Sequence, residues 1–343
     1  MKTRAKLWTL VALLGAVHIL LIFPGFFAPY DYSAQNRELS YAPPSRIHFF
    51  DSPGKFHCRP FVYAMKQGGK TSDSFSEDFV RAYPIQFFVS GAPYSILGMF
   101  TSRRHLFGVG APASISLMGT DEFGRDEFSR VLYGGRISLL AGIVATLVSL
   151  SLGAVLGTLA GFYRGWLDVL LMRGVELFLA LPWLYLLLTV RAALPLHIST
   201  VQTFLVLVAV LGMVGWARPA RLVRGVVLSA KERNYVRSAR GFGASDFYLL
   251  RRHIAPQLSS VLLTQVALLV PQYILAEVTL SFLGLGVSEP VPSWGNLLAC
   301  LQQYSVLASY WWMLFPMLMI VPLFAGYQAL AGELARRSSA AVY

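Results

Sequence analysis

Six stretches of the 343-residue chain are apolar and long enough to cross a lipid bilayer as helices. About 20 apolar residues in helical form span the hydrocarbon core. The expected spans are Leu7–Pro29, Ile137–Phe162, Leu167–Val190, Ser199–Ala217, Leu258–Leu283 and Leu307–Ala331. Only 13% of the residues are charged, compared with about 25% in soluble domains. The sequence therefore predicts an all-α membrane protein with six transmembrane helices.

The first span, within residues 1–30, has the basic residues before it that a cleaved signal peptide would have. Its apolar run is long for that role, and Pro29 directly follows Ala28, the only small residue suited to cleavage. An uncleaved anchor helix is the favoured interpretation, and a signal peptide is the alternative.

Lysine and arginine beside the spans predict the orientation, because cytoplasmic loops carry an excess of both. With the N-terminus in the cytoplasm, sixteen basic residues beside the spans fall inside, and the short outer connections hold only Arg191. The long connection between the first two spans is not counted, because long loops translocate largely regardless of charge. The sixteen are Lys2, Arg4, Lys6, Arg164, Arg173, Arg218, Arg221, Arg224, Lys231, Arg233, Arg237, Arg240, Arg251, Arg252, Arg336 and Arg337. Both termini are therefore expected in the cytoplasm. The net charge of +12 follows from this placement and does not require a nucleic-acid-binding domain.

Residues 31–118 separate the first two spans and form an insertion on the expected outer side. Short β-type runs at Phe56–Met65 and Pro84–Val89 predict a small, mostly β module. Gln67–Thr71 ends like a phosphate-binding P-loop, but Ala64 stands where that loop needs a glycine. We predict that the chain has no nucleotide site of its own.

The two cysteines, Cys58 and Cys300, lie far apart and have no companion ligands at metal-binding spacing. No metal site is expected. A disulfide between them stays open, since it requires that both lie outside the cytoplasm.

The loop at residues 229–257, between the fourth and fifth spans, is the most informative part of the chain. Gly243 predicts the end of a helix, because glycine readily adopts the left-handed conformation that closes one. Ser245 or Asp246 is suited to cap a second short helix, and Pro256 marks the start of the fifth span. Two short helices at this corner would form a compact cytoplasmic knob. A basic helix lying on anionic lipid is the alternative.

This order of elements resembles the coupling loop of ABC-importer permeases, in which Glu-Ala-Ala, three residues and Gly precede an Ile/His-x-Leu-Pro ending. The loop residues that the resemblance assigns to ATPase coupling are Arg237, Ser238, Ala239, Gly243, Asp246, His253 and Pro256. Here arginine replaces the glutamate, serine the first alanine, and alanine the leucine before the final proline. The resemblance implies that an ATPase docks on this loop.

A second segment is similar to the Gly-Thr-Asp-x-x-Gly-Arg-Asp motif of C-type dipeptide and oligopeptide permease subunits. Its residues are Gly119, Thr120, Asp121, Gly124, Arg125, Asp126, Arg130 and Arg136. Independently of the family, Asp126 and Arg130 have the i,i+4 spacing of an ion pair on a helix. Anchoring of that helix at the membrane interface explains the same charges equally well.

A third segment, Ala276–Gly286 with the Ser293-Trp294-Gly295 that follows, resembles the Glu-x-x-Leu-Ser-Phe-Leu-Gly-Leu-Gly run of the same subunits. A carboxylate inside an apolar helix is expensive, so Glu277 should face a partner or a water-filled path. The candidates for the pathway or its gate are Glu277, Ser281 and Trp294.

Two simpler features lie elsewhere in the spans. Glu176 follows Arg173 at i+3 and is expected to pair with it. Glycines at 153, 157 and 161 form a small-residue stripe that predicts close helix packing.

The family resemblance covers Gly119–Arg337 and identifies the chain as a C-type inner-membrane permease subunit of the dipeptide/oligopeptide ABC importers. It implies the type I permease fold, with a permease core at 119–337 and a cytoplasmic tail at 338–343. The implied partners are a homologous B-type permease, two P-loop ATPases that carry the ATP and Mg, and an extracytoplasmic peptide-binding protein. The chain itself would be no enzyme, would bind no cofactor, and would sit in the bacterial inner membrane. A related permease for nickel or another small solute, and an ATP-independent secondary transporter, are the alternatives.

Overall fold

The computed structural model describes residues 2–51, 54–68, 75–96, 98–193 and 199–340. The chain divides into two compact units, each described by itself. The helical unit comprises Met1–Leu14, Leu139–Leu280 and Leu323–Tyr343, and the mixed unit comprises Gly15–Ser138 and Ser281–Pro322.

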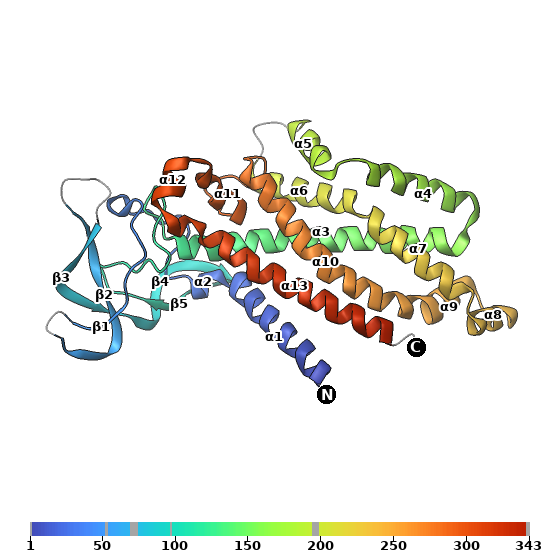
Figure 1. The fold of residues 1–343 in the computed structure, drawn as a ribbon, viewed down its shortest axis with the longest axis horizontal. Coiled ribbons are helices and arrows are strands. Elements are labelled where there is room, and N and C mark those ends of the chain that lie inside the picture. The colour runs from blue at the N-terminus through green and yellow to red at the C-terminus, as the bar shows by residue number, and fades with distance from the viewer. Residues whose placement is uncertain (1, 52–53, 69–74, 97, 194–198, 341–343) are drawn as a thin grey trace. The chain divides into compact units, whose positions relative to one another are not determined.

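Five helical stretches of the described residues are long and apolar enough to cross a membrane. They contain α1 (Lys2–Ile22), α3 (Glu127–Tyr163), α6 with α7 (Thr200–Gly215 and Ala217–Lys231), α10 (Ala255–Phe282) and α13 (Phe315–Ala340). Figure 1 shows α6 running on into α7. The prediction of a mostly helical, multi-pass membrane protein is confirmed.

The third expected span, Leu167–Val190, is divided between two helices. α4 (Gly165–Ala180) ends at an extended Leu181, and α5 (Trp183–Ala193) begins after Pro182. Proline lacks the N–H that would continue the ladder, and it disfavours the helical conformation of the residue before it. As described, neither helix alone reaches the length of a membrane span, so the predicted count of six transmembrane helices is not confirmed.

The predicted packing role of the glycine stripe is confirmed within the helical unit. A Cβ at Gly157 would lie 2.4 Å from the backbone oxygen of Ala220, and one at Gly153 would lie 2.5 Å from Pro219. A Cβ at Gly161 would lie 2.9 Å from the backbone oxygen of Arg224. Because all three neighbours belong to α7, glycine lets α3 and α7 approach backbone to backbone.

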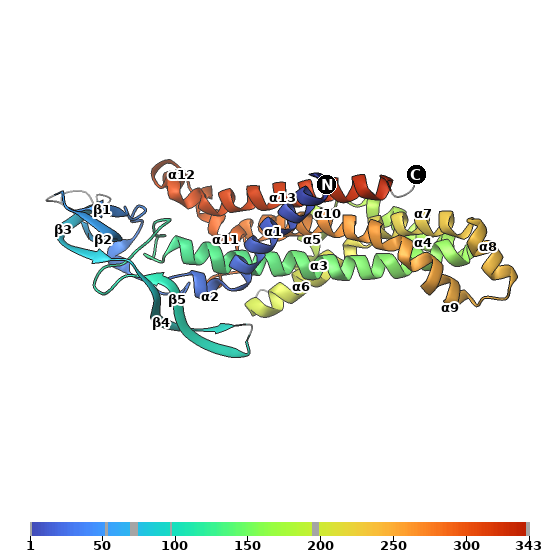
Figure 2. The ribbon, with the colours of Figure 1, turned by 90° about the horizontal axis from the view of Figure 1, so that it is seen from below.

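In its described residues, the mixed unit contains five strands in two antiparallel sheets, which Figure 2 shows as separate ribbons. β1 (His48–Phe50), β2 (Phe56–Gln67) and β3 (Phe75–Pro84) form one sheet in that order, and β4 (Gln86–Ile96) pairs with β5 (Phe100–Gly108). The run predicted at Phe56–Met65 lies within β2. The run predicted at Pro84–Val89 is not one strand, because β3 ends and β4 begins inside it. Gly69, Lys70 and Thr71 of the P-loop-like segment lie outside the described residues.

The mixed unit also contains short helices that the sequence did not predict. They are α2 (Pro24–Phe27), η1 (Arg37–Leu39), α11 (Trp294–Ala299), η3 (Cys300–Gln302), α12 (Tyr304–Ser309) and η4 (Trp311–Leu314).

The boundaries of the outermost spans differ from prediction as well. α1 ends at Ile22, before Pro24, instead of reaching Pro29. α13 begins at Phe315 and not at Leu307, because α12 and η4 occupy the preceding residues. Since α13 extends to Ala340, the tail predicted at 338–343 begins inside a helix.

Candidate functional site

The predicted helix end at Gly243 is confirmed, and it has a defined geometry. α8 (Asn234–Gly241) closes with Gly243 at φ +83°. The N–H of Gly243 donates to the carbonyl of Arg240 at 3.0 Å, and that of Ala244 donates to the carbonyl of Ala239 at 3.1 Å. These two bonds are those of a Schellman motif, which satisfies the last carbonyls of the helix.

The residue that caps the next helix is Ser245. Its side chain accepts a hydrogen bond from the N–H of Tyr248 at the start of α9 (Asp246–Leu249). The prediction of a separate second helix is wrong, since α9 continues through the π-helical turn Leu250–Ile254 (η2) into α10. Pro256 lies inside this continuous helix, directly after the π-helical turn, where its missing N–H interrupts the backbone hydrogen-bond ladder.

We call residues 229–257 the coupling segment. Its inner side is apolar, with Val236, Leu249 and Ile254 buried in one cluster. Its outer side carries Phe242, which is 92% exposed, and Phe247, which is 72% exposed. An exposed pair of large aromatic rings on a compact corner is typical of a protein-binding surface.

Two arginines of the coupling segment form ion pairs within it. Arg240 Nη2 lies 3.0 Å from Asp246 Oδ1, which ties the end of α8 to the start of α9. Arg237 pairs with Glu232, and Glu232 also pairs with Arg164 at 3.0 Å. Arginine at 237 is therefore held by a carboxylate within the same segment.

The remaining predicted residues of the segment lie on the same corner. The His253 ring packs 5.6 Å from both Tyr235 and Tyr248, centroid to centroid. The backbone carbonyl of His253 accepts a hydrogen bond from Gln257 at 2.9 Å. Ser238 and Ala239 lie in the last turns of α8. The structure thus brings all seven predicted coupling residues into one short region.

In the mixed unit, the Gly-Thr-Asp segment makes a tight backbone turn at two glycines. Gly119 has φ +73° and Gly124 has φ +70°. A Cβ at Gly124 would lie 1.8 Å from the backbone oxygen of Asn36. Thr120 Oγ1 accepts a hydrogen bond from the N–H of Ala42 at 2.8 Å. Residues after α1 therefore pack directly on this motif.

A buried ion cluster lies beside this turn. Asp121 Oδ2 accepts hydrogen bonds from Arg125 Nε at 2.7 Å and from Arg130 Nη1 at 2.5 Å. Glu289, distant in sequence, pairs with Arg125 at 2.8 Å and with Arg130 at 2.5 Å. Arg130 is only 2% exposed. The two arginines thus bridge the motif to the segment after α10.

The predicted ion pair between Asp126 and Arg130 is not among the ion pairs of the described residues. Asp126 instead accepts hydrogen bonds from the N–H and hydroxyl of Ser129, at 2.8 and 2.6 Å, at the start of α3. Complete burial raises the pKa of Asp126 to about 7. Arg130 pairs instead with Asp121 and Glu289. Arg136 lies half-buried on α3.

The three residues predicted for the pathway or its gate occupy different environments. Glu277 is fully buried in α10. Ser281 Oγ accepts a hydrogen bond from the N–H of Val287 at 3.1 Å. Trp294 is 1% exposed, and its indole N–H donates to the carbonyl of Val131 at 3.0 Å. Ser281 and Trp294 therefore have evident packing roles in the mixed unit.

Two smaller predictions are also decided. Arg173 pairs with Glu176 at 2.9 Å, as expected, and both side chains are exposed. Cys58 and Cys300 are free thiols.

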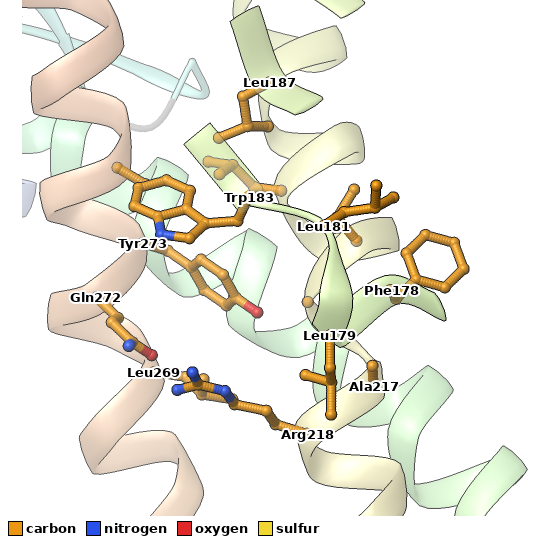
Figure 3. Close-up of a pocket in the computed structure, with 14 residues that line it drawn as sticks. Phe178, Leu179, Leu181, Trp183, Leu187, Ala217, Arg218, Leu269, Gln272 and Tyr273 are labelled. Carbon is orange, nitrogen blue, oxygen red and sulfur yellow. The ribbon is translucent and has the colours of Figure 1, made fainter. Parts of the chain in front are cut away.

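Sequence reasoning missed a cavity of about 200 Å³ in the helical unit. Figure 3 shows Leu181 and Phe178 on one side of it, Tyr273 and Gln272 of α10 on the other with the Trp183 indole beside Tyr273, and Arg218 of α7 below. Tyr273 hydrogen-bonds through its hydroxyl to Ser149 Oγ at 2.9 Å.

The break between α4 and α5 therefore lines this cavity. Pro182 inside an apolar run was the signal that could have located it.

Comparison with known proteins identifies the family. The family model described as 'binding-protein-dependent transport system inner membrane component' matches residues 153–339, which is more than half of the chain. A dipeptide transport system permease protein of Bacillus subtilis is 35% identical over 224 residues, which cover 65% of this chain and 67% of the relative. A glutathione transport system permease protein of Pectobacterium atrosepticum is 41% identical over 187 residues, which cover 54% of this chain and 60% of the relative.

Among solved structures, the chain is similar to an amino acid ABC transporter crystallised with histidines. The TM-score is 0.44 at 15% identity, and the match covers 61% of this chain and 93% of that one. On the match at residues 153–339, the chain belongs to the family of inner membrane components of binding-protein-dependent transport systems.

Proposed function

We propose that the chain is a permease subunit of an ATP-driven importer of short peptides and forms half of the translocation pathway. The observation that carries this proposal is the coupling segment, a compact corner with exposed aromatic rings, in a chain that belongs to a binding-protein-dependent transport family. The names of the dipeptide and glutathione relatives support peptides as the cargo.

In the proposed topology both termini are cytoplasmic, and α4 and α5 together make the third of six crossings. The excess of lysine and arginine beside the inner ends of the helices supports this orientation. Residues 31–118 would then lie outside the cytoplasm, and the coupling segment would lie inside it.

The energy source would be a pair of separate P-loop ATPases that bind ATP and Mg. Phe242 and Phe247 on the coupling segment would fill apolar depressions of the ATPase surface. ATP-driven closure of the ATPases would move the corner formed by α8 and α9, and α10 would transmit this movement because it is continuous with α9. A homologous B-type permease would supply the other half of the pathway.

The insertion at 31–118 would dock an extracytoplasmic peptide-binding protein or the B-type permease. Its two sheets carry exposed aromatic side chains, among them Phe50, Phe79, Phe87 and Phe100. Such residues are enriched in protein interfaces.

The experiment that tests the proposal is gentle detergent purification of the tagged chain from its native cell, with mass spectrometry of the proteins that accompany it. We expect a second permease and a P-loop ATPase. Gly243→Val should remove the ATPase and keep the second permease, because a β-branched residue at φ +83° opens the corner. Gly241→Ala, in the same helix with open space around it, is the matched control.

Recovery of the wild-type chain alone, stable and monodisperse, would contradict the proposal and favour a self-contained transporter. Uptake of nickel but not of peptides by the purified assembly would keep the importer and change its cargo.

A further inference from the structure

The cavity of the helical unit combines one cation with apolar walls. Among its described lining residues, Arg218 is the single formally charged side chain, and Gln272 contributes an amide. Trp183, Phe178 and Leu269 supply aromatic and aliphatic surface. A guanidinium beside an amide and an apolar wall is suited to an anion that carries an apolar group.

Within the part of the chain that the structure describes, no acidic side chain forms an ion pair with Arg218. Arg224, further along the same helix, binds Asp168 with two hydrogen bonds of 2.5 and 2.6 Å. Arg218 directly follows the apolar run of α6, and its side chain is exposed. Its guanidinium points toward Leu269 and Gln272 of α10 (Figure 3).

The cavity also borders a backbone irregularity. Leu181 and Trp183 flank the break between α4 and α5, and both residues line the cavity. Non-helical backbone at membrane depth is tolerated where it borders a cavity, and broken helices often form transporter binding sites.

A second constraint fixes one wall. A Cβ at Gly215 would lie 1.7 Å from the hydroxyl oxygen of Tyr273, so only glycine permits this tyrosine to bind Ser149.

We propose that this cavity is a subsite for the C-terminal residue of a peptide in transit, in which Arg218 binds the terminal carboxylate. Gln272 donates a hydrogen bond to the same group, and the residue's side chain lies against Trp183 and Phe178. About 200 Å³ is below the ~300–1,000 Å³ of sites that enclose a whole drug-sized ligand, so it suits one residue. This inference rests on the proposed function and names the part of the cargo that the chain recognises.

The test uses the purified assembly of this chain with its partner subunits in proteoliposomes, at saturating binding protein. ATP-driven uptake of radiolabelled Ala-Phe and of its C-terminal amide is measured for the wild type, Arg218→Gln and Arg218→Lys. Arg221→Gln, an exposed arginine on the same helix that does not line the cavity, is the matched control. Thermal stabilisation of each assembly by millimolar Ala-Phe or its amide gives a second readout that needs no uptake.

We expect Arg218→Gln to lower Ala-Phe uptake roughly tenfold or more, as for loss of a charged hydrogen bond, and to leave amide uptake at the wild-type level. Arg218→Lys should be intermediate, and Arg221→Gln should match the wild type. Any preference of the binding protein for one of the two peptides cancels from the comparison between variants, since every variant is assayed with the same binding protein. Ala-Phe should stabilise the wild-type assembly more than its amide does, and Arg218→Gln should abolish this difference.

Three results would overturn the subsite while leaving the importer intact. Arg218→Gln could lower uptake of both peptides equally, lower neither, or lose the second permease during purification, which would assign the arginine to subunit contact. Absence of ATP-driven uptake of either peptide by the wild-type assembly would instead overturn the proposed function, and this subsite with it.

Discussion

Replacing Arg130 by methionine tests whether the buried ion cluster holds the Gly-Thr-Asp segment together. Arg130 is 2% exposed and contacts Asp121 and Glu289, each at 2.5 Å. Removing one partner of a buried pair costs about 3–5 kcal/mol, because the other charge stays buried. The Glu289 side chain is 47% exposed and loses little, whereas Asp121 is 4% exposed and keeps Arg125. We therefore expect the lower end of the range, about 3 kcal/mol.

The assay is thermal unfolding of the purified chain in detergent. A loss of ~3 kcal/mol corresponds to a decrease in Tm of roughly 4 °C for a chain of this size. The matched control is Arg173→Met, which breaks an ion pair whose side chains are 77% and 54% exposed and should cost ~1 kcal/mol or less. Equal Tm decreases for the two variants would refute the reasoning, since burial would then not decide the strength of the pair.

Three further outcomes follow from the packing. Gly157→Ala should destabilise the folded chain by about 1–3 kcal/mol, because the added Cβ would lie 2.4 Å from a backbone oxygen of α7. Gly225→Ala, which adds a Cβ in open space on α7, should be neutral or stabilising in the same thermal assay. Asp126→Asn should flatten the pH profile of stability. The native pKa of Asp126 is about 7 and the unfolded pKa is near 3.9, so between these values the carboxyl ionises in the unfolded chain but stays protonated in the folded protein. Stability therefore falls as pH rises through this window, by on the order of 4 kcal/mol. Replacing the residues between Ser45 and Ser116 by a short linker should preserve folding, because the N–H of Ser45 donates to the carbonyl of Ser116 at 2.8 Å and the two ends are therefore adjacent. The same replacement should abolish peptide uptake. Unchanged uptake would refute the docking role of the insertion.

Local features were predictable from the sequence where one residue type determines the backbone. Gly243 ends a helix because it supplies a positive φ, and Ser245 caps the next one, as the loop sequence indicated. The glycine stripe at 153, 157 and 161 packs against a helix because its spacing places three small residues on one face.

Contacts between distant segments were not predictable from spacing alone. The i,i+4 rule assigned Arg130 to Asp126, but the side chain pairs with Glu289, which follows α10. The cavity was missed for a related reason. Arg218 was counted only as an inner flanking charge, and no local pattern shows that it lines one cavity with Gln272 and the break at Pro182.

The most direct test of the central claim is peptide uptake by the purified assembly in sealed proteoliposomes, with ATP present only on the ATPase side and with no ion gradient. We predict accumulation of a labelled dipeptide that requires ATP and the binding protein and that is lost with Gly243→Val. Accumulation that proceeds without ATP, or that an imposed proton or sodium gradient drives in the chain alone, would contradict the account and make the chain a secondary transporter.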